Sequence, residues 1–503
     1  MSHIVIQDAL YTAKSVRQLD ALALQAQDIP SITLMKRAGR AAFNELLAEW
    51  GTPEHVTVFC GAGNNAGDGY IVAALAADKG IPVRVVELSA IEKLSADAAT
   101  AREFCLKAGA QFEAFEAGLD VQEGVIVDAL LGIGYSGPMR AQYGEAIAAI
   151  NIAALPVLAL DLPSGLCADT GSAADVAVKA DITVTFVAAK QGMFTGRGPA
   201  LCGEIIYHSL DINEEIFEHL SPDAKLMDLD DLMDNFPDRE IDAYKNQFGH
   251  VMVIGGDNGF GGAAMMAAES ALRTGSGLVS VATRPIHVAA LLARQPEIMV
   301  SGVISGQELE PLLDRPTVLV VGPGLGRSPW SEQLLQKAVA TGVPMVMDAD
   351  ALNILAEGRV IAQPDGRQWV MTPHPAEAGR LLGISVAEVQ ADRFSAARRL
   401  QEKFNATIVL KGVGTLIASA DEAEIAVCPY GNPGMASGGM GDVLSGIIGA
   451  LLAQGLTPSI AAQLGCCLHS AAADMATQEQ GVRGFVASDI APFLRKLLNK
   501  EGL

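Results

Sequence analysis

In the first half of the chain, the residues that could do chemistry are oxygen-bearing side chains that directly follow apolar runs. Ligands of open α/β sheets sit outside the carboxyl ends of the strands, so we expect these side chains to converge on one crevice. Oxygen ligands without His or Cys suit a hard cation or a polar substrate, not zinc. The simpler alternative is that each aspartate only caps the helix after it. The set comprises Asp68, Asp128, Asp161, Asn64, Asn65 and Ser164.

The glycine-rich segment GAGNNAGDG (61–69) lies between an expected strand over 55–60 and a helix expected to start near Tyr70. Backbone N–H groups of such a loop can face a ligand at the sheet edge. Gly61, Gly63 and Ala66 also match the dinucleotide fingerprint, with Glu87 about 20 residues on. Alone, this match indicates either an NAD-dependent dehydrogenase or only a tight strand–helix turn.

In the second half, NPGMASGGMGDVLSGIIGALL (432–452) joins a glycine loop to the start of an apolar helix with Asp442 in its first turn. A helix N-terminus binds phosphate, and a carboxylate beside it can activate a hydroxyl toward a transferred phosphoryl group. The alternative is that Asp442 only favours the helix dipole. The sequence has no G-x-x-x-x-G-K-[ST] loop, so a P-loop mechanism is unsupported.

Two further polar residues of the second half leave two interpretations open. His374 stands between two prolines, which deny its neighbours a regular strand ladder, and it is either a ligand contact or a structural histidine. Lys411 is either a phosphate contact or a strand-end charge facing water.

The elements that must position these residues alternate between short apolar strands and helices, which is typical of parallel, doubly wound α/β domains. We expect a first domain over 1–215, an acidic linker over 216–240 and a second α/β domain over 241–503. The first-half strands are expected at 55–60, 82–88, 124–130, 156–162 and 181–187. The two halves show no repeated motif order, which favours a fusion of different units over a duplication.

Composition narrows the function classes. The net charge of −23 over 503 residues disfavours binding to nucleic acid or to an anionic membrane. The long stretch 443–473 without charged residues is interrupted by polar residues and predicts two buried helices, not a membrane span. Seven cysteines without a CxxC pair argue against a disulfide framework and a zinc site, and no secretory signal is evident, so we expect a cytoplasmic protein. The apolar content favours a homo-oligomer.

The motifs NNxGDG, D-x-L-x-G-x-G-x-x-G-P and D-x-PSG-L together resemble the epimerase half of the NAD(P)H-hydrate repair enzymes, over about 1–215. The resemblance implies a Rossmann-like three-layer domain in which Asp161 is the acid/base that interconverts the R and S hydrates of NADH or NADPH. It implies potassium ligands at Asn65, Asp128 and Ser164. The family usually has Gly where this chain has Ala66, whose Cβ restricts positive φ and close approach to the ligand. The implied substrate contacts are Asn64, Asn65, Ala66, Gly67, Asp68, Gly132, Ile133, Gly134, Tyr135, Ser136, Gly137, Pro138 and Asp161.

The motifs GGDNGFGGA, GPGLG, TPHPAE, KGVGT and GGMGD resemble the ribokinase-like NAD(P)H-hydrate dehydratases, over about 241–503. The resemblance implies that Asp442 deprotonates the ring hydroxyl, that this hydroxyl takes a phosphoryl group from ADP carried with Mg²⁺, and that elimination restores the reduced nicotinamide. The implied hydrate contacts are Ala263, Gly324, His374 and Asp442. The implied nucleotide contacts are Lys411, Gly412, Val413, Gly414, Thr415 and Gly441.

Two other hypotheses are kept. The second half could be a kinase for a vitamin or sugar alcohol, with the first half as a nucleotide-binding sensor; a kinase would release a stable phosphorylated substrate. Alternatively, the first half could be a binding module without activity. Asp161 argues against that module, because a pure binding crevice needs no carboxylate at the reacting carbon.

Overall fold

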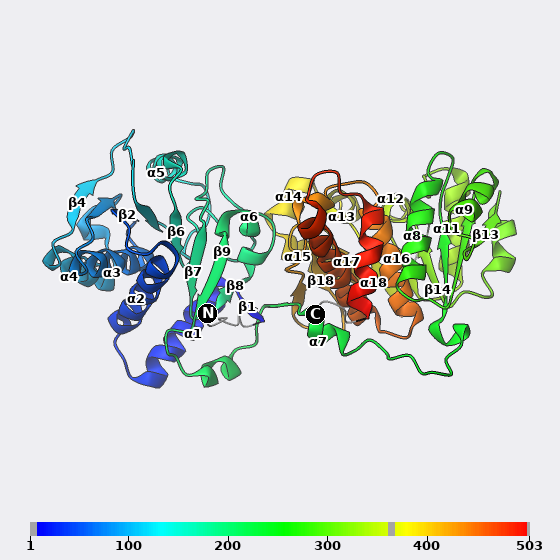
Figure 1. Cartoon of the computed structure of the whole chain (residues 1–503), viewed down its shortest axis with the longest axis horizontal. Coiled ribbons are helices and arrows are strands. Elements are labelled where there is room, and N and C mark those ends of the chain that lie inside the picture. Colours follow the sequence, from blue (N-terminus) through cyan, green and yellow to red (C-terminus); the bar gives the residue numbers. More distant parts are fainter. Residues whose placement is uncertain (1–7, 361–367, 500–503) are drawn as a thin grey trace. The chain divides into compact units, whose positions relative to one another are not determined.

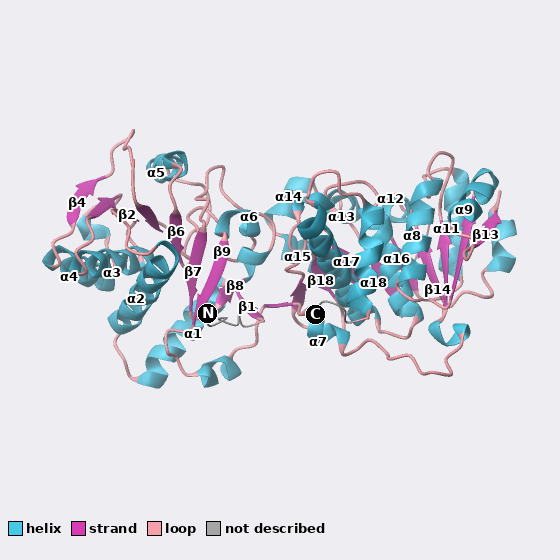
Figure 2. Ribbon diagram, viewed as in Figure 1, coloured by secondary structure: helices cyan, strands magenta, loops and turns pink. Residues whose placement is uncertain are grey.

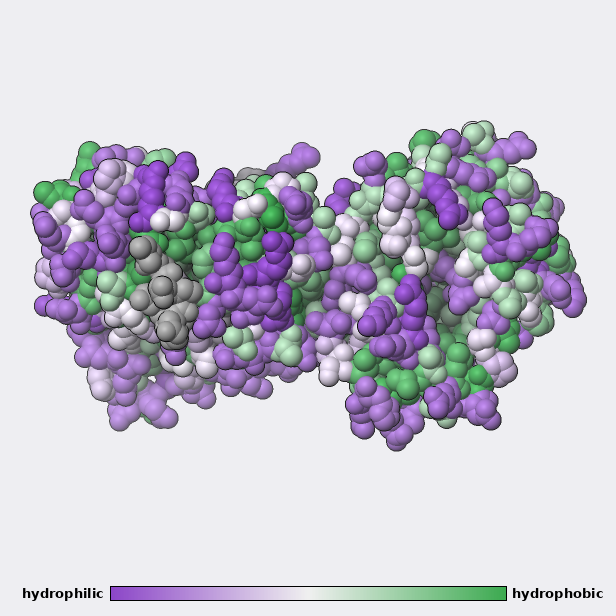
Figure 3. All heavy atoms as spheres, turned by 180° about the vertical axis from the view of Figure 1, so that it is seen from behind, coloured by the Kyte–Doolittle hydropathy of each residue, from purple (hydrophilic) through white to green (hydrophobic). Residues whose placement is uncertain are grey.

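The computed structural model describes residues 8–360 and 368–499, and the chain divides into two compact units, Met1–Lys225 and Leu226–Leu503. Each is an α/β structure with helices packed along a sheet (Figure 1, Figure 2). Hydrophilic residues cover much of the face shown in Figure 3, with hydrophobic residues among them. In the described part of the chain, no helix is both long and apolar enough to cross a membrane.

The first unit is built on a seven-stranded sheet in which every neighbouring pair is parallel. In spatial order its strands are β4 (Gln111–Ala114), β3 (Val83–Glu87), β2 (Val56–Cys60), β5 (Val125–Ala129), β6 (Val157–Leu160), β7 (Ile182–Phe186) and β9 (Glu204–His208). The chain order reverses between β2 and β5, which makes the carboxyl ends of these two strands the expected binding crevice. The five strands predicted for this half are all present, and β4 and β9 were missed.

Helices cover both faces of this sheet, because successive strand residues point to opposite sides. Val58 and Val127 belong to a core shared with α2, α3 and α4, while Phe59 and Ile126 belong to a second core shared with α5. The helices of this unit are α1 (Ala13–Gln27), α2 (Ser31–Trp50), α3 (Asn64–Asp78), α4 (Ala96–Lys107), α5 (Ala141–Ala153) and α6 (Gly198–Cys202). Beside the sheet, β1 (Ala9–Tyr11) pairs in parallel with β8 (Ala189–Lys190) and antiparallel with β10 (Ala224–Leu226).

The second unit has a sheet that is parallel from β13 to β17 and ends in two antiparallel pairings. Its order reverses between β11 and β14, so the loops after these strands share one crevice. The strands, in spatial order, are β13 (Met299–Gly302), β12 (Leu278–Thr283), β11 (His250–Ile254), β14 (Val318–Val321), β15 (Met345–Met347), β16 (Trp369–Met371), β17 (Thr407–Leu410), β18 (Leu416–Ala418) and β19 (Ile425–Val427).

The core of this unit lies between one face of the sheet and the apolar helices near the C-terminus. Val253, Val320 and Val346 contribute to it from the strands, and α8, α16, α17 and α18 cover them. The uncharged stretch 443–473 lies within α16 and α17. The helices are α7 (Leu229–Met233), α8 (Gly261–Arg273), α9 (Val288–Arg294), α10 (Gly306–Leu309), α11 (Pro329–Ala340), α12 (Ala349–Ala356), α13 (Pro375–Leu382), α14 (Val386–Ala391), α15 (Arg393–Phe404), α16 (Met440–Ala453), α17 (Pro458–Gln480) and α18 (Ile490–Leu498).

The acidic segment 216–240 contains regular structure. β10 and α7 lie within it, and Asp228 caps α7 by accepting hydrogen bonds from the N–H groups of Asp230 and Asp231. Leu229, Leu232 and Met233 are buried in the core of the second unit. The acidic segment therefore also contains apolar side chains, which attach part of it to the core of the second unit.

Candidate functional sites

The first unit has a cleft of about 510 Å³ at the switch between β2 and β5. Its walls come from the start of α3, the loop after β5 and the carboxyl end of β6. The predicted contacts that line it are Asn64, Asn65, Asp68, Gly132, Ile133, Gly134, Tyr135, Ser136, Pro138 and Asp161. The convergence expected from the strand-end positions is therefore present in the structure.

Asp161 follows β6 with a left-handed backbone, at φ 64°, which is strained for a residue with a side chain. Its carboxylate accepts hydrogen bonds from Phe186 N at 3.3 Å and from Thr185 Oγ1 at 3.4 Å. It is also in direct contact with the ammonium of Lys190, which is fully buried, while 16% of the Asp161 side chain is exposed. The buried Lys190 therefore fixes the position of the Asp161 carboxylate at the wall of the cleft.

Two more carboxyl groups share this end of the cleft, Asp20 from α1 and Asp68 from α3. Burial raises the pKa of Asp20 to about 6, against the opposing effect of Lys190. Burial, and then the charges of Asp161 and Asp20, raise the pKa of Asp68 well above its ordinary value. Three carboxyl groups around one lysine therefore disfavour the simultaneous ionisation of Asp20 and Asp68 beside Asp161.

Asp128 and Ser164 lie buried below the cleft. Asp128 accepts from Ser164 Oγ at 2.7 Å, from Ser164 N at 2.8 Å and from Leu130 N at 3.2 Å, and burial raises its pKa to about 6. Asn65 donates to the Leu131 carbonyl at 3.0 Å, and its own buried Oδ1 has no protein partner. An unsatisfied oxygen near a carboxylate and a hydroxyl is a donor set that suits a hard monovalent cation.

The expectation that α3 starts near Tyr70 is wrong, because the helix begins at Asn64 with Gly63 as its N-cap. Ala66 is therefore helical and packs in the core, so its Cβ does not obstruct the approach of a ligand as expected. Gly67 is also inside the helix, where a Cβ would lie 2.4 Å from the Met35 side chain. These residues, with the exposed Gly137, do not line the cleft.

In the second unit, Asp442 lies in the first turn of α16, after Gly439 at φ 94°. Burial, and then the nearby charge of Asp348, raise the pKa of Asp442 to about 7. The carboxyl group thus sits beside the free N–H groups of a helix start and titrates near neutrality, as a general base requires.

Lys411 is ion-paired and only 20% of its side chain is exposed, which disfavours its interpretation as a strand-end charge facing water. Its Nζ donates to Asp348 Oδ1 at 2.7 Å, and only 2% of the Asp348 side chain is exposed. Asp348 also accepts from Thr372 Oγ1 and Ser445 Oγ, both at 2.8 Å. Burial raises the pKa of Asp348, but Lys411 and these hydroxyls together hold it below its ordinary value. A Cβ at Gly441 would lie 3.3 Å from Lys411 Nζ, so the ammonium reaches the start of α16.

His374 is the N-cap of α13, and its Nδ1 accepts from Ala376 N at 3.0 Å and from Glu377 N at 3.3 Å. Nearly half of the side chain, 47%, is exposed. Burial of the rest, and then Lys411, lower the pKa of His374, while burial raises that of Glu377 to about 7. Its Nε2 lies 3.3 Å from Glu377 Oε1, so both ring nitrogens have partners at the helix start, and the exposed part of the ring is what a ligand could contact.

The KGVGT turn is organised by a buried guanidinium. Arg393 donates to the carbonyl oxygens of Leu410 at 3.1 Å, Lys411 at 3.3 Å and Gly414 at 3.5 Å. Gly412, at φ 138°, packs against it, and a Cβ there would lie 2.8 Å from Arg393 Nη1. The turn exposes Val413 and closes with a hydrogen bond from Thr415 Oγ1 to Gly412 O at 2.9 Å.

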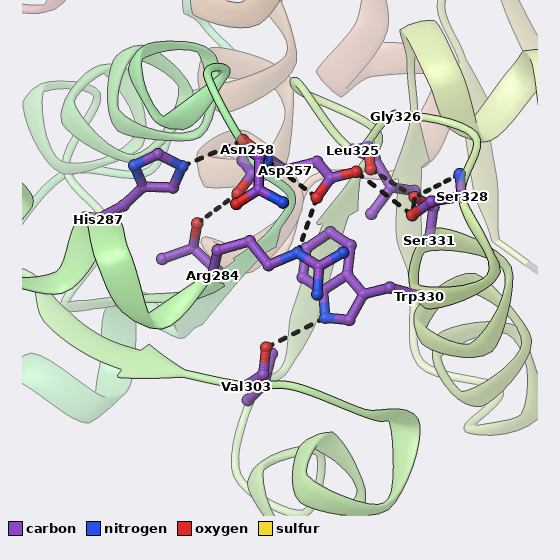
Figure 4. Close-up of polar contacts among 12 residues, drawn as sticks. Asp257, Asn258, Arg284, His287, Val303, Leu325, Gly326, Ser328, Trp330 and Ser331 are labelled. Carbon is purple, nitrogen blue, oxygen red and sulfur yellow. Dashed lines mark hydrogen bonds and ion pairs between the residues drawn. The ribbon is translucent and has the colours of Figure 1, made fainter.

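The loops after β11 and β14 meet, as the reversal of strand order requires. A Cβ at Gly324 would lie 3.1 Å from that of Ala263, so these two predicted contacts adjoin. Figure 4 shows the polar network beside them: Asp257 accepts from Arg284 Nε at 2.7 Å and from Ser328 Oγ at 3.3 Å, and Arg284 stacks on Trp330. The Asp257 amide donates to Gly324 O at 2.7 Å, which ties the two loops together.

Comparisons with known proteins decide the family. Residues 31–192 match the family model described as YjeF-related protein N-terminus, and residues 251–496 match the NAD(P)H-hydrate dehydratase model. The bifunctional NAD(P)H-hydrate repair enzyme of Coxiella burnetii is 49% identical over 97% of this chain and 99% of its own. The chain belongs to the bifunctional NAD(P)H-hydrate repair enzymes.

Other relatives of this repair enzyme agree. The bifunctional repair enzyme of Escherichia coli K12 is 40% identical over 99% of this chain and 95% of its own. A ribokinase-like superfamily protein from Enterococcus faecalis, of known structure, is 32% identical with a TM-score of 0.50, and the match covers 55% of this chain and 95% of that one. The ribokinase-like prediction is confirmed, and a small-molecule kinase fused to a sensor is not favoured.

Two residues of the repair enzyme's sites were not identified from the sequence. Asp348 ends the apolar run PMVM as Asp128 and Asp161 end theirs, so the same strand-end rule could have found it. Lys190 gives no such signal, because its contact with Asp161 depends on the left-handed turn there. Among the residues that the structure describes, no group of three or more His, Cys, Asp or Glu side chains is placed to hold a metal ion.

Proposed function

We propose that the first unit interconverts the R and S hydrates of NADH and NADPH, and that the second unit dehydrates the S form at the expense of ADP. The observation that carries this proposal is that each unit places one acid/base carboxylate at its binding edge. These are Asp161 at the cleft between β2 and β5, and Asp442 at the start of α16.

In the second unit, Asp442 accepts the proton of the ring hydroxyl, and the hydroxyl oxygen attacks the terminal phosphorus of ADP. AMP leaves, and the phosphate ester is then eliminated as inorganic phosphate together with a proton from the neighbouring ring carbon, which restores the ring double bond. The helix start and Lys411, which reaches it, supply positive potential for the transferred group. Gly412–Thr415 and Gly441 are assigned to the adenine nucleotide, with magnesium bound to its phosphates. Ala263, Gly324 and His374 are assigned to the hydrate.

In the first unit, we assign potassium to Asn65, Asp128 and Ser164. The unpartnered Asn65 Oδ1 supports this assignment, and the buried Asp128 carboxylate supplies the negative charge. A cation held there would supply a fixed positive charge at the floor of the cleft. The homo-oligomeric state and the cytoplasmic location stay predictions from composition.

The test follows absorbance at the reduced-nicotinamide band when the protein meets mixed R and S hydrates with magnesium and potassium, with ADP or ATP as donor. Complete recovery with ADP supports both activities and the donor. Recovery of the S fraction alone would make the first unit a binding module. No recovery with either donor, in protein that binds nucleotide, would overturn the proposal in favour of a kinase.

A further inference from the structure

The cleft of the first unit contains three aspartate side chains, and the buried ammonium of Lys190 donates a hydrogen bond to only one of them. Lys190 Nζ uses its three N–H groups on Asp161, on Thr185 Oγ1 at 2.9 Å and on Phe186 O at 3.0 Å. Asp20 and Asp68 therefore receive no hydrogen bond from it, although both line the same cleft. Among the described residues, no hydrogen-bond partner of the Asp68 carboxyl group is found either.

The charges that face Asp68 come from every element around it. Asp161 follows β6, Lys190 ends β8, and α1 contributes Asp20 and Arg17. Arg17 Nη2 donates to the Ile133 carbonyl at 3.4 Å, across the cleft wall. Lys190 is paired with Asp161 and has no N–H group left for Asp68. The cluster therefore has its lowest free energy when Asp68, which has no cation of its own, keeps a proton.

The chemistry of the substrate calls for two such groups. Water added to the enamine of a dihydronicotinamide places the hydroxyl on the carbon next to the ring nitrogen. By the route that breaks the carbon–oxygen bond, that carbon inverts when a hydroxyl leaves one face and another arrives on the opposite face. A neutral acid must assist the departure, and an anionic base must assist the arrival.

We propose that Asp68 is a second catalytic residue of the epimerase, the acid that protonates the departing hydroxyl, while Asp161 is the base on the opposite face. This rests on the proposed function of the first unit. The carbon–oxygen bond breaks with the Asp68 proton leaving in water, and the nitrogen lone pair forms a carbon–nitrogen double bond. A second water then adds to that carbon, its proton passes to Asp161, and the electron pair returns to nitrogen.

One inversion thus leaves Asp68 ionised and Asp161 protonated. The reverse inversion returns the proton to Asp68 and removes it from Asp161. When the reaction runs in one direction only, proton exchange with solvent through the open cleft restores the same state between turnovers. Burial and the two neighbouring aspartates keep the pKa of Asp68 well above its ordinary value, which supports the neutral form before each reaction.

The test uses the full-length protein without ADP, so that the dehydratase is silent, and follows an enriched R hydrate by chromatography over pH 5–9. Wild-type epimerisation above the uncatalysed rate establishes the proposed function, and its absence would remove that function rather than this assignment. For Asp68→Asn we expect a loss of kcat of about 100-fold or more, with KM within about threefold. The control is Asp78→Asn, at the exposed end of the same helix, which should match wild type.

The shape of the pH profile separates an acid from a structural role. Wild type should lose rate on the alkaline side as Asp68 loses its proton, and the residual rate of Asp68→Asn should lack that limb. In water labelled with ¹⁸O, each enzymatic inversion should introduce one solvent oxygen. The assignment would be overturned if Asp68→Asn kept the wild-type kcat with a raised KM, or if its pH profile kept the alkaline limb. It would also be overturned if inversion introduced no ¹⁸O from solvent.

If Asp68→Asn did not fold, the alkaline limb of the wild-type pH profile and the incorporation of ¹⁸O by the wild type would still test the role of Asp68. Thermal melting of the variant checks this, and we expect no loss of stability because the substitution removes a buried charge next to two like charges.

Discussion

The two units use a buried lysine in opposite ways. In the first unit, Lys190 contacts Asp161, the carboxylate assigned to the chemistry. In the second, Lys411 pairs with Asp348, and Asp442 is left without an ion-pair partner in the described part of the chain. Burial, and then the charge of Asp348, raise the pKa of Asp442 to about 7 against the opposing charge of Lys411.

The contrast teaches how one fold class produces two kinds of carboxylate. A direct ammonium contact holds a carboxylate in place beside other acids, which suits a base that must be positioned before the reaction begins. In the second unit, Lys411 pairs with Asp348 and not with the proposed base, Asp442. Its charge is still near the proposed phosphate site, while Asp442 can exchange protons near neutrality. The position of the lysine, rather than the presence of the carboxylate, distinguishes the two sites.

The strongest test of this contrast is Asp442→Asn. Dehydration should fall by about 1000-fold because the hydroxyl loses its base, while epimerisation in the other unit stays at the wild-type rate. Both rates are measured on the same preparation, by reduced-nicotinamide absorbance and by chromatography of the epimers. Glu479→Gln, an exposed change on α17, is the control. Loss of both activities in folded protein would mean that the sites are not independent.

Removing one lysine from each unit compares the pairs directly. Lys411→Met should destabilise the second unit by about 3–5 kcal/mol, because Asp348 would keep a buried charge without a partner. Lys190→Met should cost less, since water reaches Asp161 from the cleft. In a Trp50→Phe background, which removes the tryptophan of the first unit, denaturant unfolding followed by fluorescence of Trp330 and Trp369 reports on the second unit. The double variant Lys411→Met/Asp348→Leu should recover most of the loss. Equal stability of Lys411→Met and wild type would contradict the buried pair.

The pH dependence of dehydration follows from Asp442. Only the ionised form accepts a proton, so kcat/KM should rise about tenfold per pH unit below about 7 and level off above it. Steady-state rates between pH 5 and 9 at fixed ADP measure this. A midpoint near 4 would mean that the charge of Lys411 outweighs burial at Asp442, and the contrast between the two units would disappear.

The smallest expected effect concerns the network around Asp257. Arg284→Met removes the hydrogen bond to Asp257 and the stacking on Trp330, so the loops that hold Ala263 and Gly324 lose part of their support. We expect KM for the S hydrate to rise about tenfold with kcat within about twofold. Arg294→Met, at a mostly exposed ion pair with Glu269, is the control. A change in kcat alone would show that the network acts on the reaction step.

Much of both sites could be predicted from residues that follow apolar runs. Asp128 and Asp161 were predicted in this way, and Asp442 was predicted from the glycine loop before an apolar helix, since strand ends and helix starts are local features of a sequence. Lys190 was not, because its contact depends on the backbone turn at Asp161 and on β8, elements distant in the chain. The sequence analysis also placed Gly67 and Gly69 in a loop.

The structure places both glycines inside α3, where they allow close packing. A Cβ at Gly69 would lie 2.5 Å from that of Ala129. Whether a glycine provides an unusual φ or only space depends on what packs against it, which a single sequence does not contain.

The buried guanidinium of Arg393 gives the KGVGT turn a property that loops shaped by bound ions lack. Carbonyl oxygens converge on a positive charge that is covalently part of the chain, so it cannot dissociate, be chelated or be exchanged. The shape of this turn is therefore independent of the ionic composition of the medium. Under the proposed assignment of this turn to the adenine nucleotide, magnesium can be lost and regained with every turnover while the turn itself stays in place.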